Sequence, residues 1–416
     1  MNKIAICGGK KLSGEVDVQG SKNAALPILA ATILNGEESV IHNCPNLADV
    51  RAALEIIRQL GGKAEYNDHT AVINTENMQK YEISNELMGS MRSSVLFLGA
   101  MISRTHRAII SYPGGCAIGL RPIDLHLKAF RKLGVSVEEI GGYIYCKAEK
   151  ITPTTINLLF PSVGTTENIM LLTAISDGET VITNAAREPE IVDLQNFLNA
   201  MGAKISGAGS EIIRISGVEK LHKVEYNIIP DRIFATTCAC GVACCGGDIL
   251  LKNVDAGHIR LILSMLKDSG CKVTTVKNSI RIQCNERPRG LGKIITSPYP
   301  GFPTDAQALF MSALATAEGT TVFVENIFES RYKHVSELIK MGADIIVDGR
   351  LAAVTGCNYI QGAKIVASDL RGGAALVIAG LSAIGDTEIS DIEHIDRGYE
   401  NIENVFSSLG ASIKRK

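Results

Sequence analysis

The sequence predicts an α/β protein of two domains, each built from three repeats of about 70 residues, and three observations lead to this prediction. The first is the length of 416 residues, which exceeds what one ordinary hydrophobic core supports. The second is a glycine that ends an amphipathic helical segment six times along the chain. The third is a nearly all-apolar helical segment that recurs at the same interval.

Six helical segments end at a glycine and continue into an alternating strand, as in IIRQLGGKAEY and VFSSLGASIKR. The successive glycines lie 73, 68, 68, 72 and 68 residues apart, so one structural unit recurs along almost the whole chain. Glycine suits the left-handed residue that ends a helix, and we expect a helix-to-strand turn at each position. The six are Gly61, Gly134, Gly202, Gly270, Gly342 and Gly410.

The second recurring helix is apolar nearly all round, which is typical of a helix buried in a core. A strand of the type G-x-[TS]-V-x-[IF] and a loop separate it from the glycine-stopped helix. The repeat is therefore of the βαβαββ type, with strands wrapped around two helices, and a domain boundary is expected near residue 229 or 230. We expect the buried helices to open at Lys22, Arg92, Ser162, Asp231, Asp305 and Asp369.

Parallel buried helices would present their free N–H groups and partial positive charge on one face of each domain, which suits an anionic ligand. The loops after the strands carry arginines at equivalent places, 11 to 15 residues before the stop glycine. As a set they favour a phosphate-rich ligand, and the alternative is that each caps a helix or forms a salt bridge. They are Arg121, Arg187, Arg331 and Arg397.

The composition excludes several classes of protein. With 42 basic and 44 acidic residues the formal charge is −2, which argues against nucleic-acid binding through a broad basic face, as in a ring-shaped clamp. The apolar runs are shorter than the roughly 20 residues of a membrane span, so no membrane partner is expected. Eleven cysteines without framework spacing, and an N-terminus unlike a signal peptide, favour a reducing cytoplasm.

No metal or organic cofactor is expected. Four cysteines lie close together in DRIFATTCACGVACC, but no histidine is near and they occupy different faces of an apolar helix, so small core residues are the better interpretation. They are Cys238, Cys240, Cys244 and Cys245.

The motifs together resemble an enolpyruvyl transferase family, the UDP-N-acetylglucosamine 1-carboxyvinyltransferases, from end to end. The Gly-Gly-Cys loop and the HIDRGYE segment separate this family from the aromatic-pathway enolpyruvyl transferase of similar fold. The matching segments are SKNAALPILAA (21–31), SMRSSVLFLGAMI (90–102), YPGGCAIGLRPIDLH (112–126), PSVGTTENIMLL (161–172), NAAREPEIVDL (184–194), GFPTDAQALF (301–310), FESRYKHVSEL (328–338), ASDLRGGAALVIAG (367–380) and HIDRGYENIE (394–403).

The resemblance implies a two-domain inside-out α/β barrel with threefold symmetry in each domain. One domain would span 22–229 and the other 1–21 plus 230–416, with the active site in the cleft between them. It also implies transfer of the enolpyruvyl group of phosphoenolpyruvate to UDP-N-acetylglucosamine in peptidoglycan synthesis.

Carboxyvinyl transfer needs an acid, a base and cations, and the resemblance assigns them. Cys116 is the candidate acid and the site that fosfomycin alkylates; the alternative is a small residue packed under a loop. Lys22 is the candidate cation that binds phosphoenolpyruvate; the alternative is that it is a solvated lysine in the first turn of a helix. Asp305 is the candidate base that takes the proton of the sugar hydroxyl. The alternative is that Asp305 is the N-cap of a helix, and one residue can have both roles. Arg397, with Arg121, would pair with phosphoenolpyruvate.

The remaining assignments also come from the resemblance. Asp369 and Arg371 would hold the reacting centre, and N–H groups at the start of a helix would cradle the diphosphate. The substrate-binding set is Lys22, Asn23, Arg92, Arg121, Pro122, Ile123, Asp124, Leu125, Ser162, Val163, Gly164, Asp305, Ile327, Arg331 and Arg371.

Three residues depart from the family pattern. Phe234 stands where the family usually has glutamate, Thr236 where it has glycine, and Gly372 where a small side chain is commoner. These departures bear on the hydrogen bonding of Asp231 and Asp369. They also leave open an alternative function, a catalytically weak paralogue that binds or senses the UDP-sugar.

Overall fold

The computed structural model describes residues 3–112 and 123–416, and their contacts divide them into two compact units. We call residues 20–112 and 123–229 the first unit, and residues 3–19 and 230–416 the second unit. In the described chain the backbone passes from one unit to the other after Gln19 and after Ile229.

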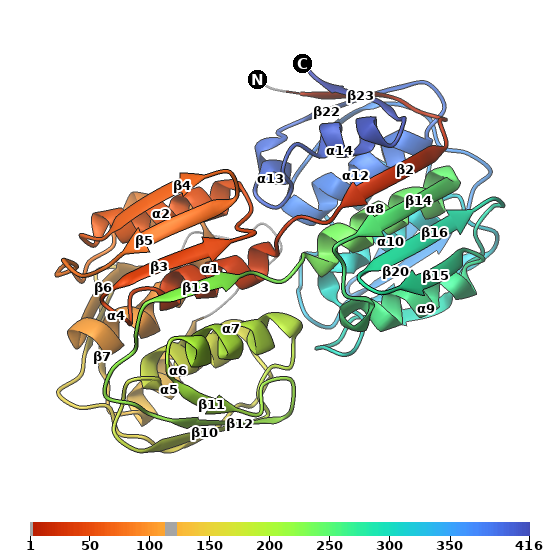
Figure 1. The fold of residues 1–416 in the computed structure, drawn as a ribbon. Coiled ribbons are helices and arrows are strands. Elements are labelled where there is room, and N and C mark those ends of the chain that lie inside the picture. The colour runs from red at the N-terminus through yellow and green to blue at the C-terminus, as the bar shows by residue number, and fades with distance from the viewer. Residues whose placement is uncertain (1–2, 113–122) are drawn as a thin grey trace. The chain divides into compact units, whose positions relative to one another are not determined.

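The first unit contains three βαβαββ-type repeats (Figure 1). Its elements in chain order are α1 (Lys22–Ala31), β3 (Glu38–His42), α2 (Ala48–Gln59), β4 (Lys63–Asn67), β5 (Thr70–Asn74), α3 (Asn85–Ser90), the 3₁₀ helix η1 (Arg92–Leu96), α4 (Phe97–Thr105), β6 (Arg107–Ser111), α5 (Asp124–Lys132), β7 (Ser136–Ile140), β8 (Tyr143–Lys147), β9 (Thr155–Asn157), α6 (Val163–Thr173), β10 (Glu179–Thr183), α7 (Pro189–Ala200), β11 (Lys204–Ser206), β12 (Ile212–Ser216) and β13 (Val224–Asn227).

The second unit repeats the same order and takes its first two strands from the N-terminus. Its elements are β1 (Ile4–Cys7), β2 (Leu12–Asp17), α8 (Arg232–Cys245), β14 (Gly247–Lys252), η2 (Ala256–Ile259), α9 (Arg260–Asp268), β15 (Lys272–Val276), β16 (Ser279–Cys284), β17 (Gly292–Ile295), α10 (Thr304–Leu314), β18 (Thr320–Val324), α11 (Val335–Lys340), β19 (Asp344–Asp348), β20 (Leu351–Thr355), β21 (Lys364–Val366), α12 (Leu370–Ser382), β22 (Asp386–Ser390), α13 (Glu393–Asp396), α14 (Ile402–Ser408) and β23 (Ser412–Arg415).

Each repeat builds one small sheet. In the sheet β17-β18-β20-β19, β17 is parallel to β18, and β20 is antiparallel to both β18 and β19. The orders β11-β12-β10-β9, β13-β3-β5-β4, β15-β16-β14-β2 and β21-β22-β1-β23 follow the same plan. The sixth sheet, β6-β8-β7, has three strands among the described residues, and a single parallel bridge from Glu82 to Ile109 takes the place of the fourth.

The apolar helices form the inside of each unit. In the second unit α8, α10 and α12 pack against one another, and in the first unit α4 packs against α1 and α6. Nearly all residues of these helices are buried, and each unit has a hydrophobic core of its own. The sheets and the amphipathic helices cover them, which is the inside-out arrangement that the family resemblance implies.

All six stop glycines have the expected left-handed conformation. Their φ angles are 101°, 87°, 104°, 104°, 91° and 89° in chain order, a region that L side chains enter only with strain. The predicted helix-to-strand turns are therefore confirmed.

The predicted start of α1 at Lys22 is confirmed, and Ser21 is the residue that caps this helix. Two other predicted helix starts need correction. Arg92 opens the short η1, and α4 itself begins at Phe97. The cap position of α10 is Pro303, so Asp305 is the second residue of that helix. Ser162, Asp231 and Asp369 lie directly before α6, α8 and α12 and cap these helices through their side chains.

Candidate active site

Two aspartates cap the starts of α8 and α12 in the second unit. Asp231 Oδ1 accepts hydrogen bonds from the N–H groups of Ile233 (2.8 Å) and Phe234 (3.0 Å). Asp369 Oδ1 accepts from the N–H groups of Arg371 (3.1 Å) and Gly372 (3.0 Å). Both caps are complete, so the departures at Phe234 and Gly372 leave this hydrogen bonding intact.

Asp305 is bound by two buried arginines. Arg331 Nη2 lies 2.8 Å from Asp305 Oδ1, and Arg371 Nη2 lies 3.2 Å from Oδ2. The side chains of both arginines are almost fully buried, at 3% and 4% exposed, whereas that of Asp305 is 26% exposed. Two guanidinium groups favour the ionised carboxylate. The interpretation of Asp305 as an N-cap is wrong, because its carboxylate contacts these side chains and Pro303 holds the cap position.

Arg371 has a further partner that the sequence did not reveal. Its Nη1 donates a hydrogen bond to the Tyr399 hydroxyl (3.0 Å), and its guanidinium lies 5.4 Å from the centre of the Tyr399 ring. Burial opposes the charge of Arg371, but Tyr399, Asp305 and Asp231 raise its pKa above the ordinary value. Arg371 is therefore a fixed cation between α10 and α12.

Asp369 has a second oxygen available beside a buried histidine. Within the described residues no hydrogen bond reaches Asp369 Oδ2. His334 is fully buried, and burial lowers its pKa to about 4, although the charge of Asp369 acts in the opposite direction. A Cβ atom on Gly372 would lie 2.6 Å from Asp369 Oδ2. The missing side chain at Gly372 thus makes room for the Asp369 carboxylate.

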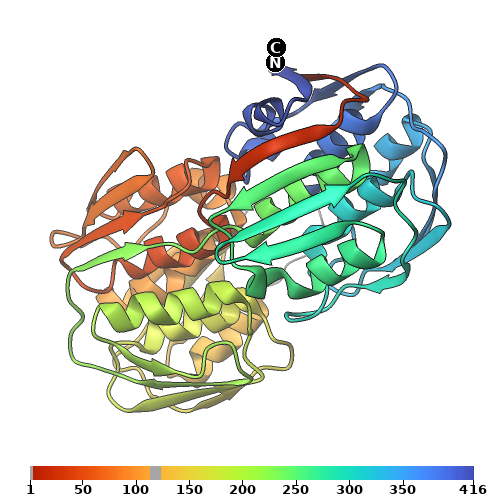
Figure 2. The same cartoon turned by 45° about the vertical axis from the view of Figure 1, so that its right-hand side comes forward.

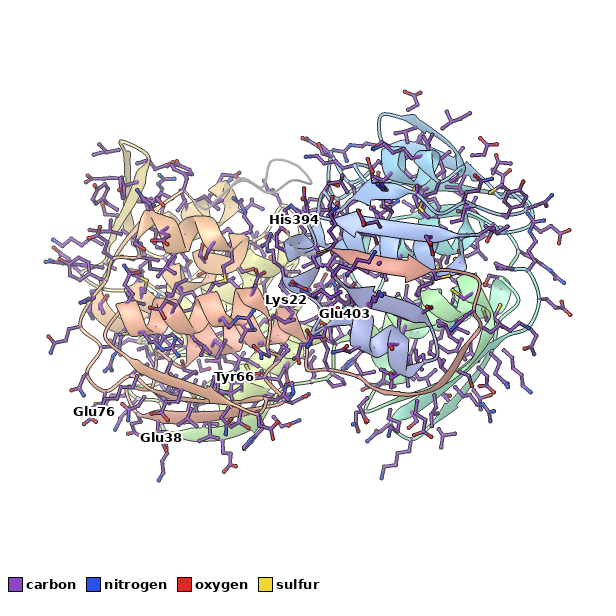
Figure 3. All side chains as sticks on the ribbon, turned by 90° about the horizontal axis from the view of Figure 1, so that it is seen from above. Lys22, Glu38, Tyr66, Glu76, His394 and Glu403 are labelled. Atoms are coloured by element: carbon purple, nitrogen blue, oxygen red, sulfur yellow. The ribbon has the colours of Figure 1, made fainter. Side chains whose placement is uncertain are left out.

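In the first unit Lys22 points into the protein rather than into solvent. Its Nζ lies 2.7 Å from Asp49 Oδ2, and the two side chains are 11% and 3% exposed. Figure 3 labels Lys22, the first residue of α1, together with Glu38 and Glu76, which are exposed residues of the same unit. The interpretation of Lys22 as a solvated lysine is wrong. Asp49, the second residue of α2, is a site partner that the sequence analysis missed.

The start of α6 is the predicted diphosphate cradle. Ser162 caps the helix by accepting from the Thr165 N–H (3.4 Å), and Val163 and Gly164 form the first turn. A Cβ atom on Gly164 would lie 3.2 Å from Cε1 of His126, a fully buried residue that the sequence analysis also missed. The glycine therefore lets an imidazole approach the helix start.

The hydrogen bonds around His126 define its tautomer. Asn168 Oδ1 accepts from the Gly99 N–H (2.8 Å), and Asn168 Nδ2 donates to the Val95 carbonyl (3.0 Å), so the amide orientation is fixed. The same Nδ2 lies 2.9 Å from His126 Nδ1, which must accept. The neutral ring then carries its proton on Nε2. Burial and the charge of Arg92 lower the His126 pKa to about 4, which agrees with a neutral ring.

The other predicted residues occupy several places. Asn23 is the second residue of α1, and Asp124 and Leu125 open α5 after Ile123. The Ile327 N–H donates to Glu325 Oε1 (2.8 Å), and Arg397 is the C-cap residue that follows α13. Cys116, Arg121 and Pro122 lie outside the described residues.

Two of the four arginines at equivalent places in the repeats form ion pairs that differ in burial. Arg331 binds Asp305 in the interior, whereas Arg187 pairs with the exposed Glu211 at 2.6 Å. For Arg187 the salt-bridge interpretation is therefore the right one.

Among residues 3–112 and 123–416, no group of three or more histidine, cysteine or acidic side chains is arranged to hold a metal ion. In the same ranges no helix has both the length and the apolar character needed to cross a bilayer. Cys238 and Cys240 belong to the hydrophobic core of the second unit.

Two units of threefold-repeated βαβαββ structure, with buried arginines, lysine and carboxylates at the helix starts, define the class of enolpyruvyl (carboxyvinyl) transferases. Residues 6–406 match the model of the EPSP synthase (3-phosphoshikimate 1-carboxyvinyltransferase) family, and the chain belongs to that family.

Curated relatives and solved structures agree with this membership. UDP-N-acetylglucosamine 1-carboxyvinyltransferase 2 of Caldanaerobacter subterraneus subsp. tengcongensis is 52% identical over the full length of both chains. The UDP-N-acetylglucosamine 1-carboxyvinyltransferase of Thermotoga maritima is 47% identical over 100% of this chain and 99% of its own. The enolpyruvyl transferase NikO from Streptomyces tendae superposes with a TM-score of 0.89 at 26% identity, covering 100% of this chain and 99% of its own. The predicted fold class and transferase activity are confirmed.

Proposed function

We propose that the chain transfers the enolpyruvyl group of phosphoenolpyruvate to the 3'-hydroxyl of UDP-N-acetylglucosamine and releases phosphate, the first committed step of peptidoglycan synthesis. The observation that carries the proposal is the 46–52% identity, over essentially whole chains, to relatives with that name. The eleven cysteines, which have no framework spacing, support a cytoplasmic location.

The reaction is an addition followed by an elimination. Asp305 takes the proton of the sugar hydroxyl as its oxygen attacks C2 of phosphoenolpyruvate, and Cys116 gives a proton to C3. In the second step C3 loses a proton and phosphate leaves from C2, which restores the double bond. The Arg331 and Arg371 contacts support the role of Asp305, because they keep the carboxylate ionised and fixed in place.

The two units supply different parts of this chemistry. In the second unit Asp305, Asp369, Arg371 and Arg397 act on the reacting centre. In the first unit Lys22, together with Arg121, neutralises the negative charge of phosphoenolpyruvate. The buried position of Lys22 near Asp49 supports this role.

The first unit also binds the nucleotide. The first-turn N–H groups of α6 meet the diphosphate, and the neutral His126 beside Gly164 adds an Nε2–H donor. Arg92 and the segment from Arg121 to Leu125 complete the contacts of this unit to the sugar nucleotide, and Ile327 of the second unit adds one more.

Phosphate release from phosphoenolpyruvate, measured with a panel of acceptors, tests the proposal. We expect release with UDP-N-acetylglucosamine and none with shikimate 3-phosphate, the acceptor that the family name suggests. Arg331→Gln should abolish most turnover, whereas Arg187→Gln, at the equivalent place in another repeat, should retain it. Release with shikimate 3-phosphate alone, or equal losses in the two variants, would overturn the proposal.

A further inference from the structure

A chain of hydrogen bonds, buried except at its Asp305 end, runs from the Asp305 carboxylate to the interior of α8. Asp305 Oδ2 binds Arg371 Nη2 (3.2 Å), and Arg371 Nη1 binds the Tyr399 hydroxyl (3.0 Å). The Tyr399 hydroxyl lies 2.8 Å from Thr237 Oγ1, and Thr237 Oγ1 lies 2.8 Å from the Ile233 carbonyl oxygen. The chain joins the three buried helices of the second unit.

The direction of every bond in this chain is fixed. The guanidinium of Arg371 can only donate, so the Tyr399 oxygen accepts. The Ile233 carbonyl can only accept, so Thr237 uses its single proton there. The phenol proton of Tyr399 must then point to Thr237 Oγ1. Tyr399 is 1% exposed, and burial raises its pKa, which keeps the proton on the phenol.

We propose that Tyr399 is a positioning residue that holds Arg371 in the orientation in which Arg371 binds Asp305; this rests on the proposed function. The phenol fixes one terminal nitrogen of the guanidinium, and its ring, 5.4 Å away, fixes the plane. The other terminal nitrogen is then directed at Asp305. Without the hydroxyl, Nη1 loses this restraint, and the orientation of the guanidinium toward Asp305 is held less tightly.

Phe234 contributes to the same arrangement. Its ring centre lies 6.3 Å from that of Tyr399, and both side chains are buried. An apolar ring at this position packs against the phenol without competing for Arg371. The departure from the family pattern at Phe234 is thereby compatible with a working Arg371.

The test is the variant Tyr399→Phe, which keeps the ring and removes only the hydroxyl. We expect kcat to fall about tenfold, as for a lost hydrogen bond to a charged group, while KM for UDP-N-acetylglucosamine changes less than about twofold. The acidic limb of the kcat profile should move to higher pH, because a loosely held cation stabilises the Asp305 carboxylate less. A merely structural role would not move this limb.

Two neighbouring threonines provide matched variants. Thr237→Val removes the acceptor of the phenol proton and should change kcat and the pH profile in the same direction. Thr236 is equally buried and bonds the Arg232 carbonyl (2.8 Å) in the same way, but it has no described bond to Tyr399. Thr236→Val should leave both quantities unchanged.

Unchanged kcat and pH profile in Tyr399→Phe would overturn the inference, as would equal effects of the two threonine substitutions. If Tyr399→Phe does not fold, Thr237→Val decides alone, because it retains the whole tyrosine. A wild-type chain inactive with both substrates would refute the proposed function, whereas an active wild type with unaffected variants would refute only the role of Tyr399.

Discussion

Buried charges at the site act in pairs, and Lys22 with Asp49 is the simplest example. Lysine at a helix start opposes the helix dipole, which suggested a functional reason for Lys22. Asp49 supplies the local compensation at 2.7 Å, so the ammonium group is held in place inside the protein. A substrate phosphate or carboxylate would then meet a lysine that is already oriented.

Lys22→Met should remove most turnover while leaving UDP-sugar binding largely intact, because the charge serves phosphoenolpyruvate. It should also lower the free energy of unfolding by about 3 kcal/mol, since Asp49 loses a buried partner. The double variant Lys22→Met with Asp49→Asn should recover stability but not activity. Calorimetric binding and denaturant unfolding measure the two effects. Loss of sugar-nucleotide binding equal to the loss of turnover would show that Lys22 is misassigned.

His126 makes the stability of the protein depend on pH in a predictable direction. Its pKa is about 4 in the folded protein and 6.5 for the ordinary group, so the unfolded chain binds more protons between these values. Its contribution is complete above pH 6.5 and is lost as the pH falls toward 4. Between pH 7.5 and 5 the wild type should lose ~2 kcal/mol more than His126→Asn, which keeps an acceptor for Asn168. If the free energies of unfolding of the two proteins changed equally with pH, the neutral buried ring would be contradicted.

At the scale of elements, the six stop glycines show what periodicity can predict. Each combines a helix end with the left-handed φ that glycine tolerates, so the local sequence determines the local structure. Helix starts were predicted less well, because Arg92 opens the short η1 rather than α4, and α10 begins at Thr304 rather than at Asp305. A polar residue near a helix start can cap the helix or contact a distant side chain, and only packing decides.

Gly270→Ala tests the role of the stop glycines without a packing artefact. The φ of Gly270 is 104°, and a Cβ atom there would meet nothing within 4 Å, so only backbone strain is introduced. We expect a loss of about 1 kcal/mol in the free energy of unfolding. Gly89→Ala, inside α3 and equally unobstructed, should be neutral or stabilising by up to about 1 kcal/mol. Thermal unfolding compares the two variants. Equal shifts of their unfolding temperatures would contradict the explanation that backbone strain at Gly270 causes the loss.

The sequence could not predict hydrogen-bond partners that lie far apart along the chain. Thr237 and Tyr399 are separated by 162 residues, and Asn168 and His126 by 42. The types and positions of Lys22, Asp305 and Arg371 were predictable from motifs. Asp49, His126 and Tyr399 were not singled out, because their importance comes from what the fold brings next to them.

At the scale of the whole molecule, two strands pair with a different repeat from the one whose helix they precede, and both lie where the chain passes from one unit to the other. In most repeats the leading strand pairs with the strand that follows its own helix, as β17 does with β18. At the two passages this changes: β2 precedes α1 but pairs with β14, and β13 precedes α8 but pairs with β3. The red β2 beside the green β14 is visible in Figure 2. The sixfold period alone does not predict this exchange.

The N-terminal segment also completes the last repeat. Strand β1 lies between β22 and β23, in the place that β20 occupies between β18 and β19. The backbones of Lys3 and Lys416 exchange hydrogen bonds of 3.0 and 2.8 Å, and both termini lie together in Figure 1. The ends of the chain thus form one structural junction.

A circular permutant tests this junction. Joining residue 416 to residue 3 by a short Gly/Ser linker and opening the exposed β19–β20 turn at Gly349 should preserve the fold and most activity, because no sheet bond is cut. Deleting residues 1–19 should instead abolish folding of the second unit, since β1 and β2 are lost from two sheets. Circular dichroism and thermal unfolding distinguish them. A folded truncation would contradict the structural role of these strands.

The central claim is addition–elimination onto UDP-N-acetylglucosamine with a solvent-exchangeable acid at C3, and the isotopic composition of the product tests it most directly. With both substrates in D2O, mass spectrometry should find a UDP-N-acetylglucosamine enolpyruvyl ether carrying deuterium on its vinyl carbon, with one phosphate released per product. Deuterium enters there only if C3 is protonated during the addition. A product without deuterium, or phosphate release without this ether, would contradict the account.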